Sequence, residues 1–340
     1  MILVTGGTGL VGSHLLYFLA KKGKKVRAIY RDKQKIDDVK QIFLFYDENS
    51  MTFFNSIEWV EADLCDYFSL EEALKEVKQV YHAAAMVSFN PHESDKMLKI
   101  NVEGTANLMN ACLFNKVEKV CYVSSISSLG KQYDGGLIDE SVEWLVDNHR
   151  SAYAYSKFRA EMEVWRAAIE GIGVVIVNPS VIIGPVDWKR SSGKLFYSVK
   201  KGMPFYTDGS TGFVDVRDVV NAVVLLMESE IVSERFILSS ENLTFREFYT
   251  LMATAMNKMK PFIRASKLLT EIGWRLNLVL CFFARKAPAI TSDTARTAQT
   301  VSLYSSKKFC DRFNYTFIPV KDAVENATKW LKMIRTVNET

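Results

Sequence analysis

Residues 1–12 read Met-Ile-Leu-Val-Thr-Gly-Gly-Thr-Gly-Leu-Val-Gly, an apolar run that leads directly into a glycine-rich loop. Gly6, Gly9 and Gly12 stand three apart, and a helical pattern follows over Leu10–Lys22. Because glycine has no Cβ, such a loop lets backbone approach a pyrophosphate, and the next helix offers free N–H groups and a positive dipole end. A tight strand-to-helix turn would use the same residue type, so the rest of the chain has to decide between the two.

The composition is that of an ordinary globular protein. The chain has 340 residues, 48% of them hydrophobic and 24% charged, with a net charge of +4, which allows a full core. We interpret the basic cluster between Lys21 and Lys35 as a solvated helix end and loop, and we expect no nucleic-acid partner. The five cysteines form no Cys-x-x-Cys pair and the four histidines lack zinc-ligand spacing. We therefore expect no metal site and a reducing, cytoplasmic setting.

The hydropathy pattern predicts no membrane span. The first strand begins at the first residue, so we expect no signal peptide. The longest strongly apolar run, Leu278–Ala284, is far shorter than the roughly 20 residues that a spanning helix needs. Burial in the core is the expected role of this run, and a membrane-surface or substrate-lining helix is the alternative.

Strand and helix patterns alternate through the first half of the chain. The expected strands are Met1–Val4, Lys25–Tyr30, Ile57–Val60, Gln79–Ala83, Lys119–Val123 and Val174–Val177, and the expected helices are Leu10–Lys22, Asp95–Asn115 and Tyr153–Ile169. This alternation predicts an α/β fold with a Rossmann-type doubly wound parallel sheet, which binds ligands at the carboxyl ends of its strands.

After Pro179 the pattern loosens into short pieces separated by glycine and proline. Later elements are expected at Asp215–Met227 (helix), Arg235–Leu238 (strand), Phe245–Met256, Ser266–Phe283 and Val320–Met333 (helices). We predict a dinucleotide-binding domain over 1–178, to which 213–239 returns. The segments 179–212 and 240–335 are predicted to form a smaller, mainly helical substrate lobe.

Tyr153 and Lys157 stand four apart in a helical pattern and therefore share one face. An ammonium group near a phenol favours the phenolate, so this pair is a sensible proton-transfer unit. Ser124 and Ser125 follow a strand at the rim where the glycine loop is expected, and a hydroxyl there would bond a substrate carbonyl or only backbone. Asn101 would brace backbone or hold a water.

These motifs, in this order, resemble those of extended short-chain dehydrogenases/reductases. The matching segments are Thr5–Gly12, Asp63-Leu64, His82–Ala85, Asn101–Thr105, Ser124-Ser125, Tyr153-x-x-x-Lys157, Asn178–Ser180, Gly184-Pro185 and Phe213–Val219. The resemblance covers nearly the whole chain and is greatest to the dihydroflavonol-reductase and hydroxysteroid-dehydrogenase-like branch. Asn178 is a departure, because many extended members carry arginine before the proline.

The resemblance implies a role for each matching residue. Tyr153 would donate the proton in a reduction, Lys157 would hold the nicotinamide ribose, and Ser125, five residues before a glycine, would be the catalytic serine, with Asn101 as a further candidate. The implied cofactor-binding residues are Gly6, Gly7, Thr8, Gly9, Leu10, Val11, Gly12, Tyr30, Arg31, Asp63, Leu64, Ala83, Ala84, Ala85, Asn101, Ser124, Tyr153, Lys157, Pro179 and Val181.

The end of the second strand discriminates between the two nicotinamide dinucleotides. An acidic residue there binds the adenosine ribose, whereas a basic residue suits a 2′-phosphate. Tyr30 occupies the position that is acidic in NAD-type relatives, and Arg31 follows it. A guanidinium group fits a phosphate well, so NADP is favoured over NAD, although Asp32 could turn toward the ribose.

The leading hypothesis is a carbonyl reductase or alcohol dehydrogenase acting on a fairly large apolar or aromatic small molecule. The expected pocket is built from Met86–Phe89, Gly130–His149 and the second lobe, with at least half of its apolar side chains in the core. Its candidate apolar residues are Phe89, Trp188, Phe196, Phe205, Tyr206 and Leu276–Phe283.

Three other functions share the motifs or the fold. A nucleotide-sugar epimerase uses the same Ser/Tyr/Lys set with tightly bound NAD, but Tyr30 and Asn178 speak against it; a dehydratase would carry acidic residues where Ile126 and Ser127 stand. A non-catalytic dinucleotide-binding scaffold or sensor would have lost Tyr153 or Lys157. Extended relatives often pair two long helices into a four-helix bundle, so the resemblance also implies a homodimer.

Overall fold

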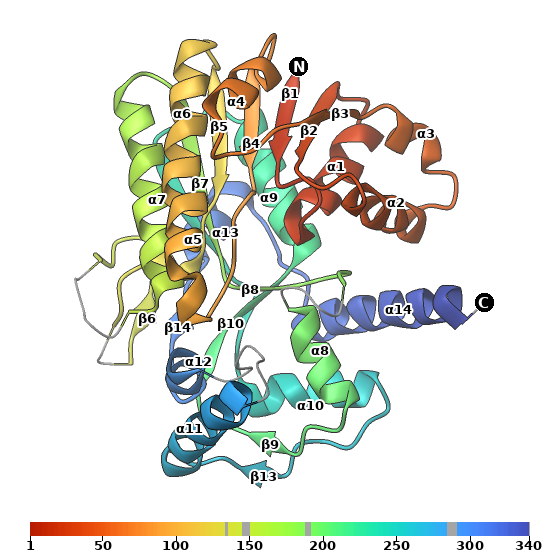
Figure 1. The fold of residues 1–340 in the computed structure, drawn as a ribbon, viewed down its shortest axis with the longest axis vertical. Helices are drawn as coiled ribbons and strands as arrows, with labels where there is room; N and C mark the ends of the chain where they lie inside the picture. The colour runs from red at the N-terminus through yellow and green to blue at the C-terminus, as the bar shows by residue number, and fades with distance from the viewer. Residues whose placement is uncertain (133–134, 145–149, 188–191, 284–290, 340) are drawn as a thin grey trace.

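A parallel sheet between two helical layers forms the larger part of the molecule (Figure 1). The computed structural model describes residues 1–132, 135–144, 150–187, 192–283 and 291–339; at 276, 278–283 and 335–339 it describes the backbone but not the side chains. Among these residues, seven strands form the main sheet in the order β11-β7-β5-β4-β1-β2-β3. The predicted doubly wound α/β fold is confirmed.

Successive residues of each strand face opposite helical layers, because side chains alternate along a strand. Leu3 packs in the layer of α4, α6 and α7, whereas Val4 packs in the layer of α1 and α9. The strands are β1 (Ile2–Thr5), β2 (Val26–Tyr30), β3 (Glu58–Glu61), β4 (Gln79–His82), β5 (Lys119–Val123), β7 (Gly173–Pro179) and β11 (Glu234–Leu238). The covering helices are α1 (Leu10–Lys21), α2 (Lys35–Tyr46), α3 (Met51–Asn55), α4 (Tyr67–Ala73), α6 (Gly104–Phe114), α7 (Ala152–Ile169) and α9 (Val216–Glu228).

A second, smaller part of the chain lies beyond the carboxyl ends of the strands (Figure 1). Its strands are β8 (Val181–Ile183), β10 (Ser210–Asp215) and β12 (Glu241–Thr244) in one sheet, β9 (Phe205–Tyr206) with β13 (Ile263–Arg264), and β6 (Leu137–Ile138) with β14 (Leu303–Tyr304). Its helices are α8 (Gly193–Lys200), α10 (Phe245–Ala255), α11 (Lys267–Phe283), α12 (Ser292–Thr297) and α14 (Val320–Glu339). α13 (Lys307–Phe313) instead returns to the main sheet, where Phe309 packs against Phe236 of β11. The apolar run Leu278–Ala284 lies outside the residues whose side chains are described.

The helix predicted over Asp95–Asn115 is interrupted. α5 (Ser94–Leu98) passes into a π-helical turn, η2 (Lys99–Glu103), before α6 begins. The wider turn contains Asn101, whose side chain holds the backbone of Met86. π-Helical turns inside an α-helix, which replace the regular i to i−4 hydrogen bonds, are frequent at functional sites.

No helix among the described residues combines the length and the apolar content needed to cross a bilayer.

Candidate functional site

The glycine loop is pressed against the chain that leaves β4. Gly6 has φ +69°, and a Cβ at this position would lie 2.6 Å from the backbone nitrogen of Ala84. A Cβ on Gly12 would lie 2.1 Å from the carbonyl oxygen of Gly6. Only glycine fits at both positions, so bare backbone stands at the N-terminus of α1, as an anion-binding loop requires.

The other predicted cofactor residues around this loop divide by exposure. Gly9 and Ala85 are exposed, and Thr8, Leu10, Ala83 and Ala84 are half-buried. Gly7 and Val11 are buried, and Val11 packs in the core, so only their backbones are available to a ligand. Leu64 is also buried, and its side chain leaves no room for a Cβ on Gly104.

The end of β2 presents a cation. Arg31 is exposed, and its guanidinium lies 3.9 Å from the carboxylate of Asp63, a residue predicted to border the adenine. Tyr30 packs edge-on against Trp59. Asp32 instead accepts a hydrogen bond from the backbone N–H of Gln34 and lies 3.7 Å from Lys35, so its carboxylate is already engaged within its own turn.

Tyr153 lies half-buried at the start of α7, and its phenol is hydrogen-bonded to the side chain of Ser125. The ring of Phe89 meets it edge-on, with the ring centres 5.8 Å apart. Burial raises the pKa of Tyr153 above its usual value, and the hydrogen bond from Ser125 partly opposes this shift. The structure thus brings together the two side chains predicted to hold a carbonyl oxygen.

Lys157 lies one turn further along α7 and is only 2% exposed. Its ammonium donates to the phenolic oxygen of Tyr122 at 3.0 Å and to the carbonyl oxygen of Val123 at 2.8 Å. Burial lowers the pKa of Lys157 to about 7, while the charge of Glu161 opposes this effect. We expected Lys157 to lower the pKa of Tyr153. That pKa is instead raised, because burial of the phenol dominates and the ammonium is bonded to Tyr122.

A buried carboxylate lies beneath the site. Glu161 is 1% exposed, and one of its oxygens accepts hydrogen bonds from Ser124 (2.7 Å), Ser128 (2.7 Å) and the amide of Asn178 (3.0 Å). Its other oxygen accepts from Arg235 of β11 at 3.3 Å. The Glu161 network therefore joins α7, β7 and β11 to the segment that follows β5, just behind the predicted catalytic groups. The hydroxyl of Ser124 is engaged in this network.

Both the oxygen and the nitrogen of the Asn101 side-chain amide form hydrogen bonds. Its oxygen accepts from the N–H of Met86 at 2.7 Å, and its nitrogen donates to the carbonyl oxygen of Met86 at 2.9 Å and to Ser156 at 3.0 Å. Of the two predicted roles, the described contacts are those of a brace, which fixes the segment after the alanines beside α7.

Three residues were missed by sequence reasoning. Tyr122 receives the Lys157 ammonium, and it stacks on His82, whose ring bridges Thr5 and Thr105 through hydrogen bonds of 2.7 and 2.9 Å. Glu161 could have been found, since it lies four residues after Lys157 and so shares its helical face. Tyr122 sits in an apolar strand pattern and gave no separate signal, whereas His82 was part of a matching segment but had no role assigned to it.

The predicted pocket residues have different environments. Phe196 is buried at 1% exposure and packs with Phe213 and Phe248 in the core of the second part, so it does not line a pocket. Pro179 is buried, Val181 half-buried, and Phe205 exposed. Trp188 and the side chains of Leu276 and 278–283 lie outside the described residues, as does part of Gly130–His149.

Taken together, these residues fit a nicotinamide dinucleotide. The glycine loop is a cradle that a Cβ would fill, Arg31 offers a guanidinium at the end of β2, and a tyrosine–serine pair stands at the carboxyl ends of the strands. These sites lie along one rim of the sheet, where α/β folds bind such ligands.

Comparisons with known proteins agree with this geometry. A family model described as "NAD dependent epimerase/dehydratase family" matches residues 2–237. A Synechocystis protein provisionally named dihydroflavonol 4-reductase is 28% identical over 97% of this chain and 94% of its own. Tetraketide alpha-pyrone reductase 2 of Arabidopsis thaliana is 31% identical over 74% of this chain and 81% of its own.

Among solved structures, the crystal structure of gox2253 superposes with a TM-score of 0.80 at 29% identity, covering 98% of both chains. A UDP-glucuronic acid 4-epimerase from Bacillus cereus superposes with a TM-score of 0.76 over 98% of this chain and 99% of its own. At 18% identity the latter likeness is one of fold alone.

Proposed function

Because the chain belongs to the NAD dependent epimerase/dehydratase family, as its motifs predicted, we propose that it is an NADP(H)-dependent reductase of ketones or aldehydes. Its substrate would be a fairly large apolar or aromatic small molecule, and the alcohol would be oxidised in the reverse direction. The observation that carries the proposal is the phenol of Tyr153, bonded to Ser125 and flanked by the ring of Phe89.

The protein groups have distinct parts in this reduction. When bound, the dinucleotide supplies a hydride to the carbonyl carbon. Ser125 and Tyr153 hold the carbonyl oxygen, and Tyr153 donates its phenolic proton as negative charge develops there. A pKa raised by burial keeps the phenol protonated and therefore able to donate. The carbonyl oxygen thereby becomes the hydroxyl group of the alcohol product, and Tyr153 is left as a phenolate that regains a proton from solvent.

Lys157 would hold the nicotinamide ribose with its buried ammonium, which is anchored by Tyr122 and Val123. Glu161 favours the charged form of this lysine against the effect of burial. Asn101 contributes by fixing Met86, at the expected edge of the substrate pocket.

Arg31 supports NADP over NAD. Its guanidinium is exposed at the end of β2, and its one ion pair with a described residue is the long 3.9 Å contact with Asp63, so it is available to a 2′-phosphate. The acidic neighbour that could have bound the ribose, Asp32, is engaged with its own turn.

The relatives support an apolar substrate. The names of two of them describe reductases of a dihydroflavonol and of a tetraketide pyrone. The exposed ring of Phe89 beside Tyr153 offers the aromatic surface that such molecules would contact.

Assembly and location remain parts of the proposal. A cytoplasmic homodimer would pair α6 and α7 of one copy with those of another. Phe114 of α6 and Ile169 of α7, which are 66% and 89% exposed, offer apolar surface for this contact.

The test is a titration of the cofactor-free protein with NADPH and NADH, followed by nicotinamide fluorescence, and then a screen of ketones and aldehydes. We expect tighter binding of NADPH and turnover of an apolar carbonyl compound. A Tyr153→Phe variant should bind NADPH normally but lose about 10²- to 10⁴-fold in turnover. Tightly held NAD with turnover of nucleotide sugars would indicate an epimerase instead. Full activity of Tyr153→Phe would refute the mechanism.

A further inference from the structure

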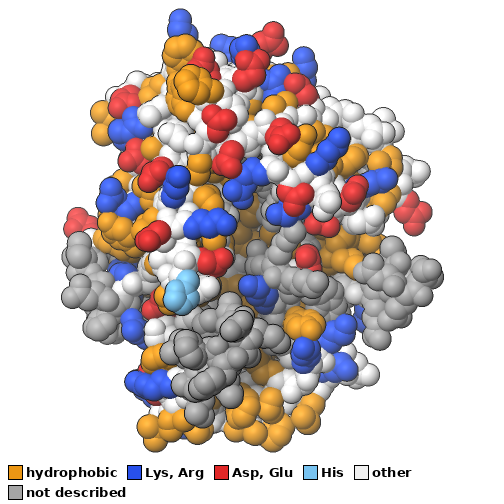
Figure 2. Space-filling view, viewed as in Figure 1, with side chains coloured by type: hydrophobic (Ala, Val, Ile, Leu, Met, Phe, Trp, Pro, Cys, Tyr) orange, Lys and Arg blue, Asp and Glu red, His pale blue; other side chains and the backbone are white. Residues whose placement is uncertain are grey.

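A cluster of exposed apolar side chains lies at the end of the molecule remote from the glycine loop. It comprises Phe205, Met259, Phe262, Ile263, Leu268, Leu269 and Ile272, which are between 36% and 70% exposed. We call this cluster the distal apolar surface. Figure 2 shows hydrophobic atoms gathered along the lower edge, where Figure 1 draws β9, β13 and α11, with basic side chains close by. Apolar patches of this kind on soluble domains mark interaction sites.

The short ribbon of β9 and β13 has two different faces. Phe205 pairs with Ile263, and Tyr206 pairs with Arg264, in parallel register. Because side chains alternate along strands, the first pair faces outward while the second lines a groove of about 1100 Å³ on the other side. The ribbon therefore separates an apolar outer surface from a groove whose lining residues are mainly polar and charged.

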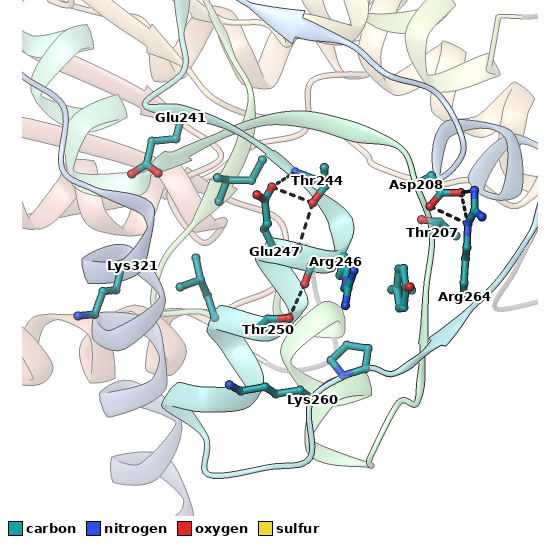
Figure 3. A pocket seen from close by; sticks show the side chains of 14 residues that line it. Thr207, Asp208, Glu241, Thr244, Arg246, Glu247, Thr250, Lys260, Arg264 and Lys321 are labelled. Atoms are coloured by element: carbon teal, nitrogen blue, oxygen red, sulfur yellow. Dashed lines mark hydrogen bonds and ion pairs between the residues drawn. The ribbon is translucent and has the colours of Figure 1, made fainter.

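The groove adds basic groups beside the distal apolar surface. Figure 3 shows Arg264 paired with Asp208, whereas Lys260 and Lys321 form no ion pair with an acidic residue among those that the structure describes. Arg246 also lines it, with its guanidinium 4.8 Å from the ring centre of Tyr206.

The start of α11 continues the pattern. Leu268 and Leu269 each lie one helical turn before Ile272, and all three are exposed, so they form one stripe. Lys267 precedes the stripe, and Lys258 follows α10 nearby in the chain; both are exposed, and neither is paired with a described acidic group.

From these observations we infer that the distal apolar surface docks on an anionic lipid bilayer. Phe262, Leu268 and their neighbours would enter the headgroup and acyl boundary, while Lys258, Lys260 and Lys267 contact lipid phosphates. Cations beside an exposed apolar stripe suit such an interface, because apolar burial and electrostatic attraction to anionic lipids then act on the same surface. A two-fold contact between copies fits less well, since it would set the lysines of one copy against those of the other. This inference goes beyond the proposed reductase activity and does not depend on it.

The test is flotation of the full chain with vesicles of phosphatidylcholine, with and without phosphatidylserine. We expect binding to the anionic vesicles only, weakened by added salt. Lys267→Ala should weaken binding about fivefold. Leu268→Ser and Phe262→Ser should each weaken it about tenfold or more.

The matched controls are Lys25→Ala and Phe68→Ser, which alter exposed residues near β2 and in α4 and should leave vesicle binding unchanged. Melting temperatures of all variants verify folding. Three results would overturn the inference: no binding to either vesicle, equal binding to both that Leu268→Ser does not affect, or a dimer in solution that Leu268→Ser dissociates. The last result would assign the surface to a second copy of the chain.

Discussion

Replacing Gly12 by alanine should weaken cofactor binding and destabilise the fold at the same time. The new methyl group would lie 2.1 Å from the carbonyl oxygen of Gly6 and 2.8 Å from the Cα of Gly7. Both are backbone atoms, so no side chain can rotate away. Restoring a 3.0 Å contact moves the start of α1 by at least 0.9 Å, the difference between the two distances.

We expect this shift to cost about 1–3 kcal/mol of unfolding free energy, as overpacking typically does. Loss of one charge-assisted hydrogen bond from the loop would weaken NADPH binding by about 10- to 150-fold. Fluorescence titration measures the affinity, and thermal unfolding without cofactor measures the stability.

Two other glycines separate the two effects. A Cβ on Gly9 would lie 3.2 Å from the same oxygen, so Gly9→Ala should spare stability yet obstruct a pyrophosphate at this exposed position. Gly23 has φ +69° with nothing within 4 Å of its Cβ position, so Gly23→Ala should cost about 1–2 kcal/mol without changing NADPH affinity. If Gly12→Ala kept both its melting temperature and its affinity for NADPH, the reasoning from the loop geometry would be refuted.

Arg31→Ala should weaken NADPH binding about 10- to 100-fold and leave NADH binding nearly unchanged in parallel titrations; equal losses would contradict a phosphate contact. Burial lowers the pKa of His14 to about 4 and that of His82 to about 3, so the unfolded chain binds protons first as the pH falls below 6.5. Stability should therefore decrease below about pH 6.5, by up to about 1.4 kcal/mol per pH unit for each histidine, until about pH 4 for His14 and about pH 3 for His82, and a melting temperature independent of pH across this range would contradict this. Glu161→Gln should destabilise the protein by about 3 kcal/mol in denaturant titrations, and combining it with Arg235→Gln should cost less than the sum of the two, whereas additive losses would show that the pair is not coupled.

The main sheet was predictable because most of its strands are continuous runs of buried apolar residues, with β3 at the edge as the exception. The hydrophobic pattern located β2, β4, β5 and β11 to within a residue or so at their ends. The glycine loop was equally readable, since its geometry depends on residues that are adjacent in the chain.

The second part of the chain was harder to predict, because its order comes from contacts between distant segments. Val181 in β8 is paired with Phe213 in β10, and Ser210 is paired with Thr244 in β12, although none of these strands has a clear alternation of its own. The hydrogen-bond partner of Lys157 could not be predicted from the sequence either, because Tyr122 lies 35 residues away and only the fold brings the two side chains together.

The path of the chain through the main sheet has a consequence for biosynthesis. β7 gains its outer neighbour, β11, only after β8, β9 and β10 have been made. A fragment ending at residue 178 would expose β7 as an unpaired edge carrying the apolar residues 174–177, which favours edge-to-edge association. During translation, the edge of β7 would thus remain unpaired until Leu238, the last residue of β11, has left the ribosome. A stable fragment would need to extend to about residue 239, where the sheet is complete.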